Sequence, residues 1–514
     1  MTFLSLEFLV FLPIVLLAWN MLTKEGITPA SILLLAIASA VFYSWGHGIQ
    51  GLTLVLCSAL ANYGFGLWIG ASAGLRRKLI LCGSILSNCL FLAYYKYASF
   101  LVGIFLQVSN IQPFSTPAIF LLGISFFTLQ QIAYLVIVNQ YGAPERSLLN
   151  YLGYILFFPK IVAGPIVYST DYFGQFSKQW EGNTQRSRDL SVGIALFAFG
   201  AFKKLVLSEN IGTSADLAFQ SVGHGNFSLL SAWVGILSYT LQLYFDFSGY
   251  CDMSLGVARM FGIKLPQNFN SPLRATSLVE FWKGWHMTMT RFFTDHIYNP
   301  IAIRLTRALI KRGAGRMHMF MISAAIPTLI TFAVSGIWHG AGWNFLLFGL
   351  VHGIGLTVNQ LWKTAKMPQL PDPIGWVLML LTVMVSFVFF RAPDISSAIL
   401  FFKGLVSSNV VWPEGMSPLV SHLPGHIGEV AGVSRTSIAY VVLGFLIVLL
   451  LPNPQYLLRN FEPSLRFKAN PRGAGIFASL NWSPTTLWAL TAFACMAFAL
   501  KYAYKETVFI YYQF

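Results

Sequence analysis

The sequence predicts an all-α protein that crosses a membrane many times. Of its 514 residues, 56% are hydrophobic and 16% are aromatic, whereas only 10% are charged. A soluble globular protein carries charge on about a quarter of its residues, so the low charge indicates a lipid environment. The composition also excludes disordered, collagen-like and disulfide-scaffold proteins. A nucleic-acid binder is excluded as well, because it needs basic residues gathered on a water-soluble face.

Apolar stretches recur along the whole chain with the length of about 20 residues that a membrane-spanning helix needs. In chain order, the candidate segments are residues 3–22, 28–45, 49–70, 79–107, 117–139, 151–168, 190–207, 228–247, 320–338, 343–362, 374–391, 438–452 and 484–503. Some are short or contain Gly and Pro, and we expect several of these to be re-entrant or oblique. The pattern therefore predicts a bundle of about 10–13 membrane segments. The first segment contains Glu7 and follows no basic residue, which favours an uncleaved helix over a secretory signal.

One stretch, residues 248–318, breaks the apolar pattern. It holds many polar and charged residues together with Phe, Trp and Met, and it lacks the Gly/Ser repetition of a linker. We therefore expect a folded insertion that lines a cavity. The insertion belongs to a single membrane domain, residues 1–514, between N-terminal spans in 1–247 and C-terminal spans in 319–514.

The positive charges gather in three clusters, which we number in chain order. The chain has 33 Lys and Arg against 18 Asp and Glu, a net charge of +15. The first basic cluster is Arg76, Arg77 and Lys78, the second is Arg304, Arg307, Lys311, Arg312 and Arg316, and the third is Arg459, Arg466, Lys468 and Arg472. Such clusters mark cytoplasmic loops, and one of them could also hold an anionic cosubstrate.

The sequence predicts no bound metal and no disulfide. The cysteines, Cys57, Cys82, Cys89, Cys251 and Cys495, have no C-x-x-C spacing and lie in apolar sequence, so we expect buried small residues. No group of His, Cys and Asp has metal-ligand spacing, and no glycine-rich phosphate loop or nucleophile elbow is present. The missing nucleophile motif favours direct transfer over a covalent enzyme intermediate.

His339 is the first candidate catalytic residue. It lies in the run 335–344 (SGIWHGAGWN), which joins two apolar segments, and an ionisable group at membrane depth is by default a functional candidate. A neutral imidazole there could act as a general base, with the indoles of Trp338 and Trp343 as cavity walls. The alternative is a hydrogen-bonded histidine that packs one helix on another.

His286 is the second candidate. The run 280–286 (EFWKGWH) fits a helix with one polar stripe in an aromatic setting, although an interfacial histidine is an equal alternative and spacing cannot show whether His286 meets His339. Asp246 and Asp252 fall about 240° apart around a helix, which argues against a shared metal. We expect both aspartates to be structural. They would either bind backbone where the helix breaks near Gly249 or pair with a basic side chain such as Arg259. His352 is expected to pack.

Several motifs together resemble a known family. They are residues 245–250 (FDFSGY), 252–253 (DM), 258–262 (ARMFG), 265–269 (LPQNF), 280–286 (EFWKGWH) and 338–340 (WHG). Supporting runs are 5–9, 123–128, 158–160, 163–166, 203–204, 389–392, 452–454 and 509–514. The combination closely resembles the membrane-bound O-acyltransferase superfamily, in its bacterial alginate O-acetylation branch. The sequence departs from the usual pattern at Lys283 and Gly284, where Arg-Arg is common, and at 134–138, which lacks an acid.

The resemblance implies a helical bundle around a central funnel, in which His339 is the catalytic histidine and His286 meets it. It implies transfer of an acyl group, usually acetyl, from a cytoplasmic donor such as acetyl-CoA to an acceptor on the outer side, with periplasmic acetyltransferase partners, in the bacterial inner membrane. No cofactor is expected to be bound. We expect Trp338, Trp285, Trp282 and Asn268 to contact substrate, and Arg304, Lys311 and Arg312 to hold the donor phosphates.

Several alternatives remain open from the sequence. The same fold serves a relative that transfers D-alanine to teichoic acids, so the motifs leave the acyl group open. The acceptor could be alginate, cellulose, another exopolysaccharide or peptidoglycan. From another class, a transporter of a polysaccharide or lipid-linked precursor could use the same polar path, although the chain lacks the internal repeats of many transporters. An assembly scaffold is a third hypothesis.

Overall fold

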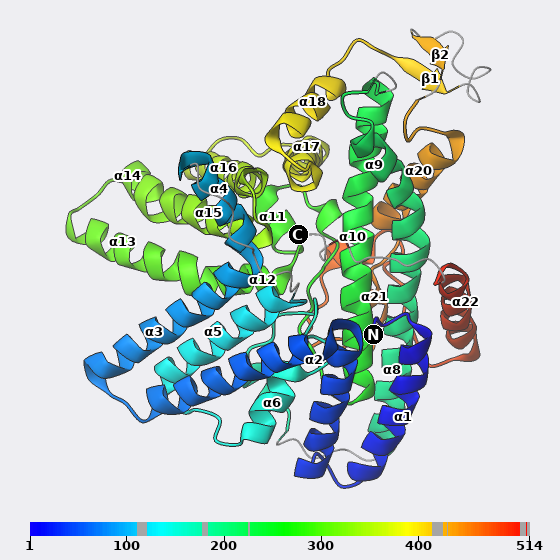
Figure 1. Ribbon diagram of the computed structural model, residues 1–514. Helices are drawn as coiled ribbons and strands as arrows, with labels where there is room; N and C mark the ends of the chain where they lie inside the picture. The colour runs from blue at the N-terminus through cyan, green and yellow to red at the C-terminus, as the bar shows by residue number, and fades with distance from the viewer. Residues whose placement is uncertain are drawn as a thin grey trace.

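The structure is a bundle of helices with little β-structure (Figure 1). This computed structural model describes residues 1–109, 121–176, 183–224, 227–413, 425–428, 430–503 and 510. The α-helices are α1 (Leu6–Leu22), α2 (Pro29–Gly70), α3 (Gly74–Leu92), α4 (Ala98–Ser109), α5 (Ile124–Tyr141), α6 (Leu148–Leu156), α7 (Ser169–Phe173), α8 (Asn183–Ala201), α9 (Glu209–Gln220), α10 (Leu229–Met260), α11 (Leu278–Trp282), α12 (Met287–Phe293), α13 (Asn299–Lys311), α14 (Arg316–Phe320), α15 (Ile326–His339), α16 (Trp343–Thr364), α17 (Asp372–Arg391), α18 (Ile395–Leu405), α20 (Arg435–Leu450), α21 (Pro454–Leu457) and α22 (Thr486–Tyr502). Short π-helical segments are η1 (Ala93–Tyr97), η2 (Phe202–Ser208), η4 (Thr294–Tyr298) and η5 (Met321–Ala325), and 3₁₀ turns are η3 (Pro272–Arg274), η7 (Arg459–Phe461) and η8 (Pro471–Ala474). Strands β1 (Val411–Pro413) and β2 (His426–Gly428) pair in parallel.

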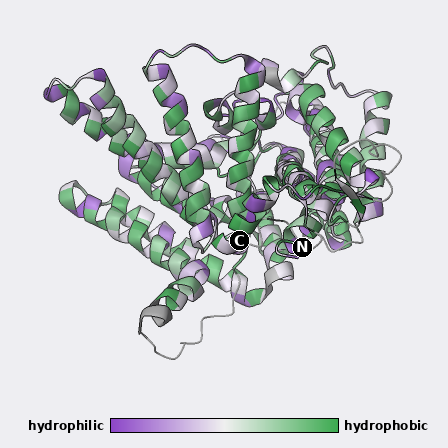
Figure 2. Ribbon diagram, turned by 90° about the horizontal axis from the view of Figure 1, so that it is seen from above, coloured by the Kyte–Doolittle hydropathy of each residue, from purple (hydrophilic) through white to green (hydrophobic). Residues whose placement is uncertain are grey.

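Eight helical stretches among the described residues are long and apolar enough to cross a membrane. They are Pro29–Gly46, Gly48–Gly70, Gly74–Ile104, Thr184–Gln220, Arg316–His339, Trp343–Thr364, Asp372–Arg391 and Arg435–Phe461, and α1, α18 and α22 are shorter apolar helices. Hydrophobic residues predominate along the long helices (Figure 2), and many large ones are exposed, among them Leu6 at 77% and Ile49 at 79%. Such surfaces suit lipid contact, and the predicted all-α polytopic membrane fold is confirmed.

The predicted segment at 151–168 does not form a span. Helix α6 ends at Leu156, and residues 157–168 continue as buried backbone that is not α-helical. Pro159 and Pro165 lack the N–H that a helix interior needs. A Cβ on Gly164 would lie 2.5 Å from the Cα of Lys160, so this backbone folds tightly on itself. In the predicted segment 117–139, helix α5 begins at Ile124, and residues 117–120 lie outside the described part.

Helices α8 and α10 form a closely packed pair in the bundle and lie side by side in Figure 1. A Cβ on Gly249 would lie 2.7 Å from the carbonyl oxygen of Gly200, and a Cβ on Gly256 would lie 2.6 Å from that of Gly193. Small residues allow such close backbone contact in membranes. The predicted break at Gly249 is therefore wrong, because this glycine serves helix packing and α10 continues through it to Met260.

Buried ion pairs join the same two helices. The η2 segment after α8 presents Lys203 to Asp252, with Nζ 2.8 Å from Oδ2, and Lys204 to Asp246. Arg259 instead contacts Asp189 of α8, at 2.7 Å. These ion pairs support the predicted structural role of Asp246 and Asp252. The prediction that Arg259 pairs with them is wrong, because Arg259 pairs with Asp189. A helix rises 1.5 Å per residue, so Arg259 starts two turns away from Asp252, whereas the lysines face both aspartates across the helix contact.

The cysteines depart from the expected burial. Cys251 is buried and Cys495 is half-buried, but Cys57, Cys82 and Cys89 are exposed. All five are free thiols. The three exposed residues lie on α2 and α3, whose outer faces are apolar, so an apolar sequence context here indicates a lipid-facing position as readily as a core position. In the terminal run 509–514, only Ile510 is described, and its backbone N–H donates to Asp246 Oδ2 at 3.1 Å.

Candidate active site

His339 is the last residue of α15, at the turn of a tight helical hairpin. Gly340 is extended, with φ −162° and ψ 162°, so α15 ends there and α16 begins at Trp343. The two helices pack closely because a Cβ on Gly336 would lie 2.3 Å from the carbonyl oxygen of Phe345. The hairpin therefore fixes the backbone at His339 inside the protein.

Aromatic rings surround the His339 side chain, which is 5% exposed. Its ring centroid lies 4.9 Å from that of Trp338, 5.3 Å from Phe348 and 5.4 Å from Phe390, all in edge-to-face geometry. These rings come from α15, α16 and α17. Of the two indoles predicted as walls, Trp338 lies against His339, but Trp343 is 57% exposed and packs on Phe100 at 6.0 Å, so its predicted place is wrong. The apolar walls that are present exclude bulk water.

His286 is fully buried between α11 and α12 and has a left-handed backbone, with φ 42° and ψ 52°. This conformation is uncommon for a residue with a Cβ and is often found at functional sites. Two hydrogen bonds hold the backbone beside it: the Met287 N–H donates to the Asn268 carbonyl at 2.9 Å, and the Thr288 N–H donates to Asn268 Oδ1 at 3.1 Å.

Asn268 also fixes the tautomer of His286. Because the Thr288 N–H can only donate, the side-chain atom that it contacts must be the amide oxygen of Asn268. His286 Nδ1 lies 3.1 Å from the same oxygen, so Nδ1 donates its hydrogen and Nε2 carries the lone pair. Burial lowers the pKa of His286 to about 3, which keeps the ring neutral at physiological pH.

The two histidines meet around Trp338. The Trp338 ring centroid lies 4.9 Å from that of His339 and 6.3 Å from that of His286. Phe126 of α5 closes the group, at 5.7 Å from Trp338 and 6.2 Å from His286. Residues far apart in the sequence thus form one buried cluster of two imidazoles and an indole.

Trp285 and Trp282, two other residues predicted to contact substrate, pack against aromatic rings. Trp285 stacks on Phe281 at 5.4 Å and lies edge-to-face with Phe269 at 5.1 Å. Trp282 instead contacts His352 and Phe332, each at 4.9 Å. Trp282 therefore packs α11 onto the α15–α16 hairpin, and its contact with substrate stays a prediction.

His352 has the packing role that was expected. It is fully buried, and its Nε2 lies 2.8 Å from Ser386 Oγ. This contact joins α16 to α17.

The basic candidates Arg304, Lys311 and Arg312 are exposed on and just after α13. In Figure 1, α13 extends away from α12 and the centre of the bundle. Their exposed charges lie on a helix that also exposes Ile303 and Ile310, a pattern that suits a membrane interface. A role in holding donor phosphates stays a prediction.

At the departure Lys283-Gly284, the structure explains the glycine. A Cβ on Gly284 would lie 2.7 Å from the carbonyl oxygen of Asn270, so this loop leaves no room for the arginine that is common there.

Sequence reasoning missed Lys96. Its ammonium donates to the carbonyl oxygens of Trp338 and His339, both at 2.8 Å. The available signal was a lysine inside the predicted apolar segment 79–107, since ionisable residues within spans are rare and usually functional.

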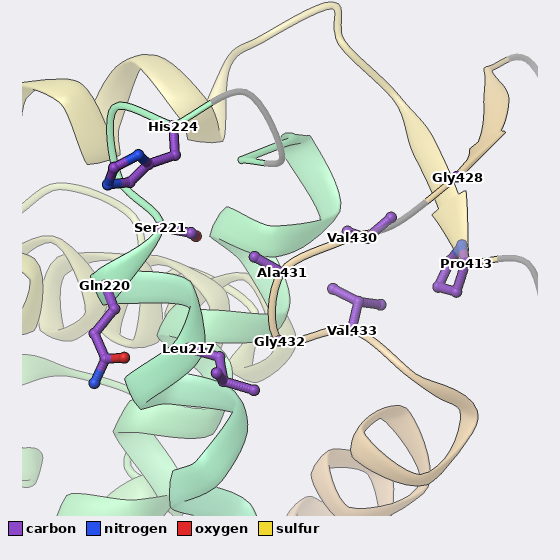
Figure 3. Close-up of a pocket in the computed structure, with 10 residues that line it drawn as sticks. All are labelled: Leu217, Gln220, Ser221, His224, Pro413, Gly428, Val430, Ala431, Gly432 and Val433. Atoms are coloured by element: carbon purple, nitrogen blue, oxygen red, sulfur yellow. The ribbon is translucent and has the colours of Figure 1, made fainter.

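Two cavities lie outside the histidine cluster. The larger, of about 590 Å³, is formed by the end of α9, the β1–β2 pair and the segment before α20 (Figure 3). Its described lining residues include none of the predicted site residues. The smaller, of about 190 Å³, is lined by Asn270, Lys283 and Gly284 among others, and lies next to the segment that carries His286.

Replacing Asn268 with alanine should lower the turnover rate about tenfold or more, because misplacement of a reacting or orienting group by about 1 Å can cost 100-fold. The variant removes the acceptor that fixes the His286 tautomer. Initial rates of acyl transfer measure the effect. Asn210→Ala is the matched control, since Asn210 lies on α9, lines neither cavity described here, and its amide donates to the Val206 carbonyl at 2.6 Å. Equal rates for both variants would contradict the assigned role of Asn268.

Comparisons with known proteins show which family the chain belongs to. Residues 139–400 match the model of MBOAT, the membrane-bound O-acyltransferase family. The chain is 31% identical to the peptidoglycan O-acetyltransferase of Helicobacter pylori, over 98% of this chain and 95% of that protein. It is 33% identical to the probable alginate O-acetylase AlgI of Azotobacter vinelandii, over 71% and 70%. It is 28% identical to the teichoic acid D-alanyltransferase of Streptococcus thermophilus, over 52% and 68%.

The family match, residues 139–400, includes both His286 and His339. With the all-α membrane bundle and the buried pair of histidines around Trp338, the comparisons show that this chain is an O-acyltransferase that belongs to the membrane-bound O-acyltransferase family.

Proposed function

We propose that this enzyme moves acetyl from cytoplasmic acetyl-CoA across the bacterial inner membrane to hydroxyl groups of a cell-envelope polysaccharide, directly or through a periplasmic partner protein. The observation that carries the proposal is the pair of buried imidazoles, His339 and His286, whose ring centroids lie 4.9 Å and 6.3 Å from that of Trp338. Relatives with the printed names peptidoglycan O-acetyltransferase and alginate O-acetylase support acetyl as the acyl group and a polysaccharide as the acceptor.

In the proposed reaction, His339 acts as the general base. Its neutral imidazole accepts the proton of the acceptor hydroxyl as the oxygen attacks the thioester carbonyl. The carbon–sulfur bond then breaks, and the imidazolium returns the proton to the leaving thiolate. His286 orients or polarises a reacting group through its neutral ring, which Asn268 holds in one tautomer. The aromatic walls exclude water that would hydrolyse the donor.

The small cavity beside Lys283 is the proposed mouth for the donor. Asn470, which also lines it, lies in the chain segment of the third basic cluster, and such clusters are typically cytoplasmic. The exposed ammonium of Lys283 then offers a charge for the donor phosphates. Lys283 also lies three residues before His286 in the sequence, whereas the second basic cluster begins at Arg304.

Lys283→Met should raise the KM for acetyl-CoA about two- to fivefold and leave kcat unchanged, since an exposed charge pair contributes about 0.2–1 kcal/mol. Lys311→Met is the matched comparison, because it removes one lysine of the second basic cluster. If Lys311→Met raises the KM and Lys283→Met does not, the donor phosphates lie on α13 instead.

The activity itself is tested with purified protein in liposomes. Labelled acetyl-CoA is supplied on one side, and alginate, peptidoglycan fragments and cellulose oligosaccharides are supplied in parallel on the other. We expect labelled ester on one of them, with release of free CoA. Where a partner protein is needed, mass analysis of polymer from cells with and without the gene shows the loss of acetyl groups. An unchanged polymer together with no transfer in liposomes would contradict the proposal.

D-alanyl transfer is the second candidate, favoured by the similarity to a teichoic acid D-alanyltransferase. It predicts that acetyl-CoA is not consumed and that an activated D-alanyl donor is.

A further inference from the structure

We propose that Lys96 is a positioning residue that holds the catalytic end of α15. The inference rests on the proposed role of His339, and it concerns a lysine in the membrane stretch Gly74–Ile104. Lys96 lies in η1, a π-helical turn between α3 and α4. Such turns inside α-helices are frequent at functional sites.

The end of α15 depends on side chains for its hydrogen bonds. The last carbonyl groups of any helix lack partners within that helix. Many helices satisfy them with a glycine in the left-handed conformation, but Gly340 is extended, with φ −162°. The terminal carbonyls of α15 therefore need donors from elsewhere, in a protein interior where an unpaired carbonyl is costly.

Two consecutive residues of η1 supply those donors. The Lys96 ammonium donates to the carbonyls of Trp338 and His339, both at 2.8 Å. The Tyr97 hydroxyl donates to the carbonyl of Ile337 at 2.8 Å and lies 3.2 Å from that of Trp338. The final three carbonyls of α15 are thus tied to one turn of another span.

The contacts of Lys96 define what it does. An ammonium has three N–H donors, and the third reaches Ser125 Oγ at 3.3 Å, at the start of α5. With its donors directed to these three oxygens, the Lys96 side chain is fixed at the C-terminal end of α15. It also lies 5.8 Å from the centre of the Trp338 ring. Lys96 therefore sets the position of Trp338 and His339 through their backbone carbonyls.

The test uses Lys96→Met, which keeps the length of the side chain and removes the charge and the donors, together with Lys96→Arg and Tyr97→Phe. Lys363→Met is the matched control, because Lys363 is an exposed lysine in the last turn of α16. Each protein is purified in detergent, its thermal midpoint is measured, and kcat and KM for acetyl-CoA are compared. Hydrogen exchange is followed in the peptide covering 330–345.

Lys96→Met should lower kcat about 10- to 100-fold and change KM less than about twofold, because a displaced catalytic group costs rate rather than donor affinity. Lys96→Arg should recover part of the rate, Tyr97→Phe should lose less than Lys96→Met, and exchange should rise mainly in 330–345. A wild-type rate for Lys96→Met overturns the inference. So does a loss of activity that comes with a fall in thermal midpoint and faster exchange throughout the bundle.

Failure of the proposed function can be told apart from failure of this inference. If the wild-type protein transfers no acyl group from any donor, the proposed function fails, and the exchange of 330–345 in Lys96→Met then decides whether Lys96 holds the end of α15.

Discussion

Replacing His339 with alanine is expected to lower the rate of acyl transfer about 100- to 10,000-fold, the range that a general base contributes. The substitution removes the proton acceptor from a site whose aromatic walls offer few polar groups in its place. His339 contacts the rings of Trp338, Phe348 and Phe390, so the variant also leaves a small cavity. Transfer of labelled acetyl from acetyl-CoA in membranes measures the rate.

The control for this prediction lies on the same membrane stretch. His318 is exposed near the start of Arg316–His339, and His318→Ala should transfer at the wild-type rate. The thermal midpoint of His339→Ala in detergent shows whether the bundle is intact. A folded His339→Ala protein that transfers acetyl as fast as the wild type would falsify the catalytic assignment.

The second large effect is expected on stability. Lys203→Met should reduce the free energy of unfolding by roughly 3–5 kcal/mol, the cost of leaving one partner of a buried ion pair unpaired. Lys203 Nζ lies 2.8 Å from Asp252 Oδ2, and the Asp252 side chain is 2% exposed. Gln455 also donates to Asp252 Oδ1, so the carboxylate is held by two helices. Unfolding titrations in mixed micelles measure the change.

A double variant separates the ion pair from general disruption. Lys203→Met with Asp252→Asn removes both charges and keeps an oxygen for Gln455, so it should recover most of the lost stability. The coupling energy then follows from the double-mutant cycle. Lys403→Met, at an exposed lysine of α18, should change stability by less than about 0.5 kcal/mol. If the double variant is as unstable as Lys203→Met, the charge pairing is not the cause.

Much of the fold could be predicted because its determinants are local. The apolar stretches around 28–45, 320–338 and 374–391 appear as Pro29–Gly46, Arg316–His339 and Asp372–Arg391. Length and hydropathy suffice for such spans, since lipid requires each backbone to satisfy its own hydrogen bonds. The segment at 151–168 is an exception to this rule. Its backbone after Leu156 is not α-helical, and it is tolerated because the surrounding protein buries it.

The site was predictable only in part. His339 and Trp338 are adjacent in the sequence, and a histidine at the end of an apolar segment can be recognised as a functional candidate from the sequence alone. The role of Asn268 as the acceptor that fixes His286 could not be read from its position, because it depends on a hydrogen bond to Thr288 across a loop. Lys96 was overlooked for a similar reason: its partners are backbone carbonyls of a helix far away in the chain.

The sequence by itself determined that this protein lies in a membrane, that its charges are scarce and clustered, and that His339 and His286 are its candidate catalytic groups. Hydropathy and residue type are properties of short segments, and they can be read from the sequence without knowledge of the fold. The tertiary structure decided that both imidazoles meet one indole, that Lys203 and Lys204 rather than Arg259 pair with the aspartates, and that Lys96 holds the end of α15. These contacts join distant segments, and only the packing of the helices brings their polar groups within hydrogen-bonding distance.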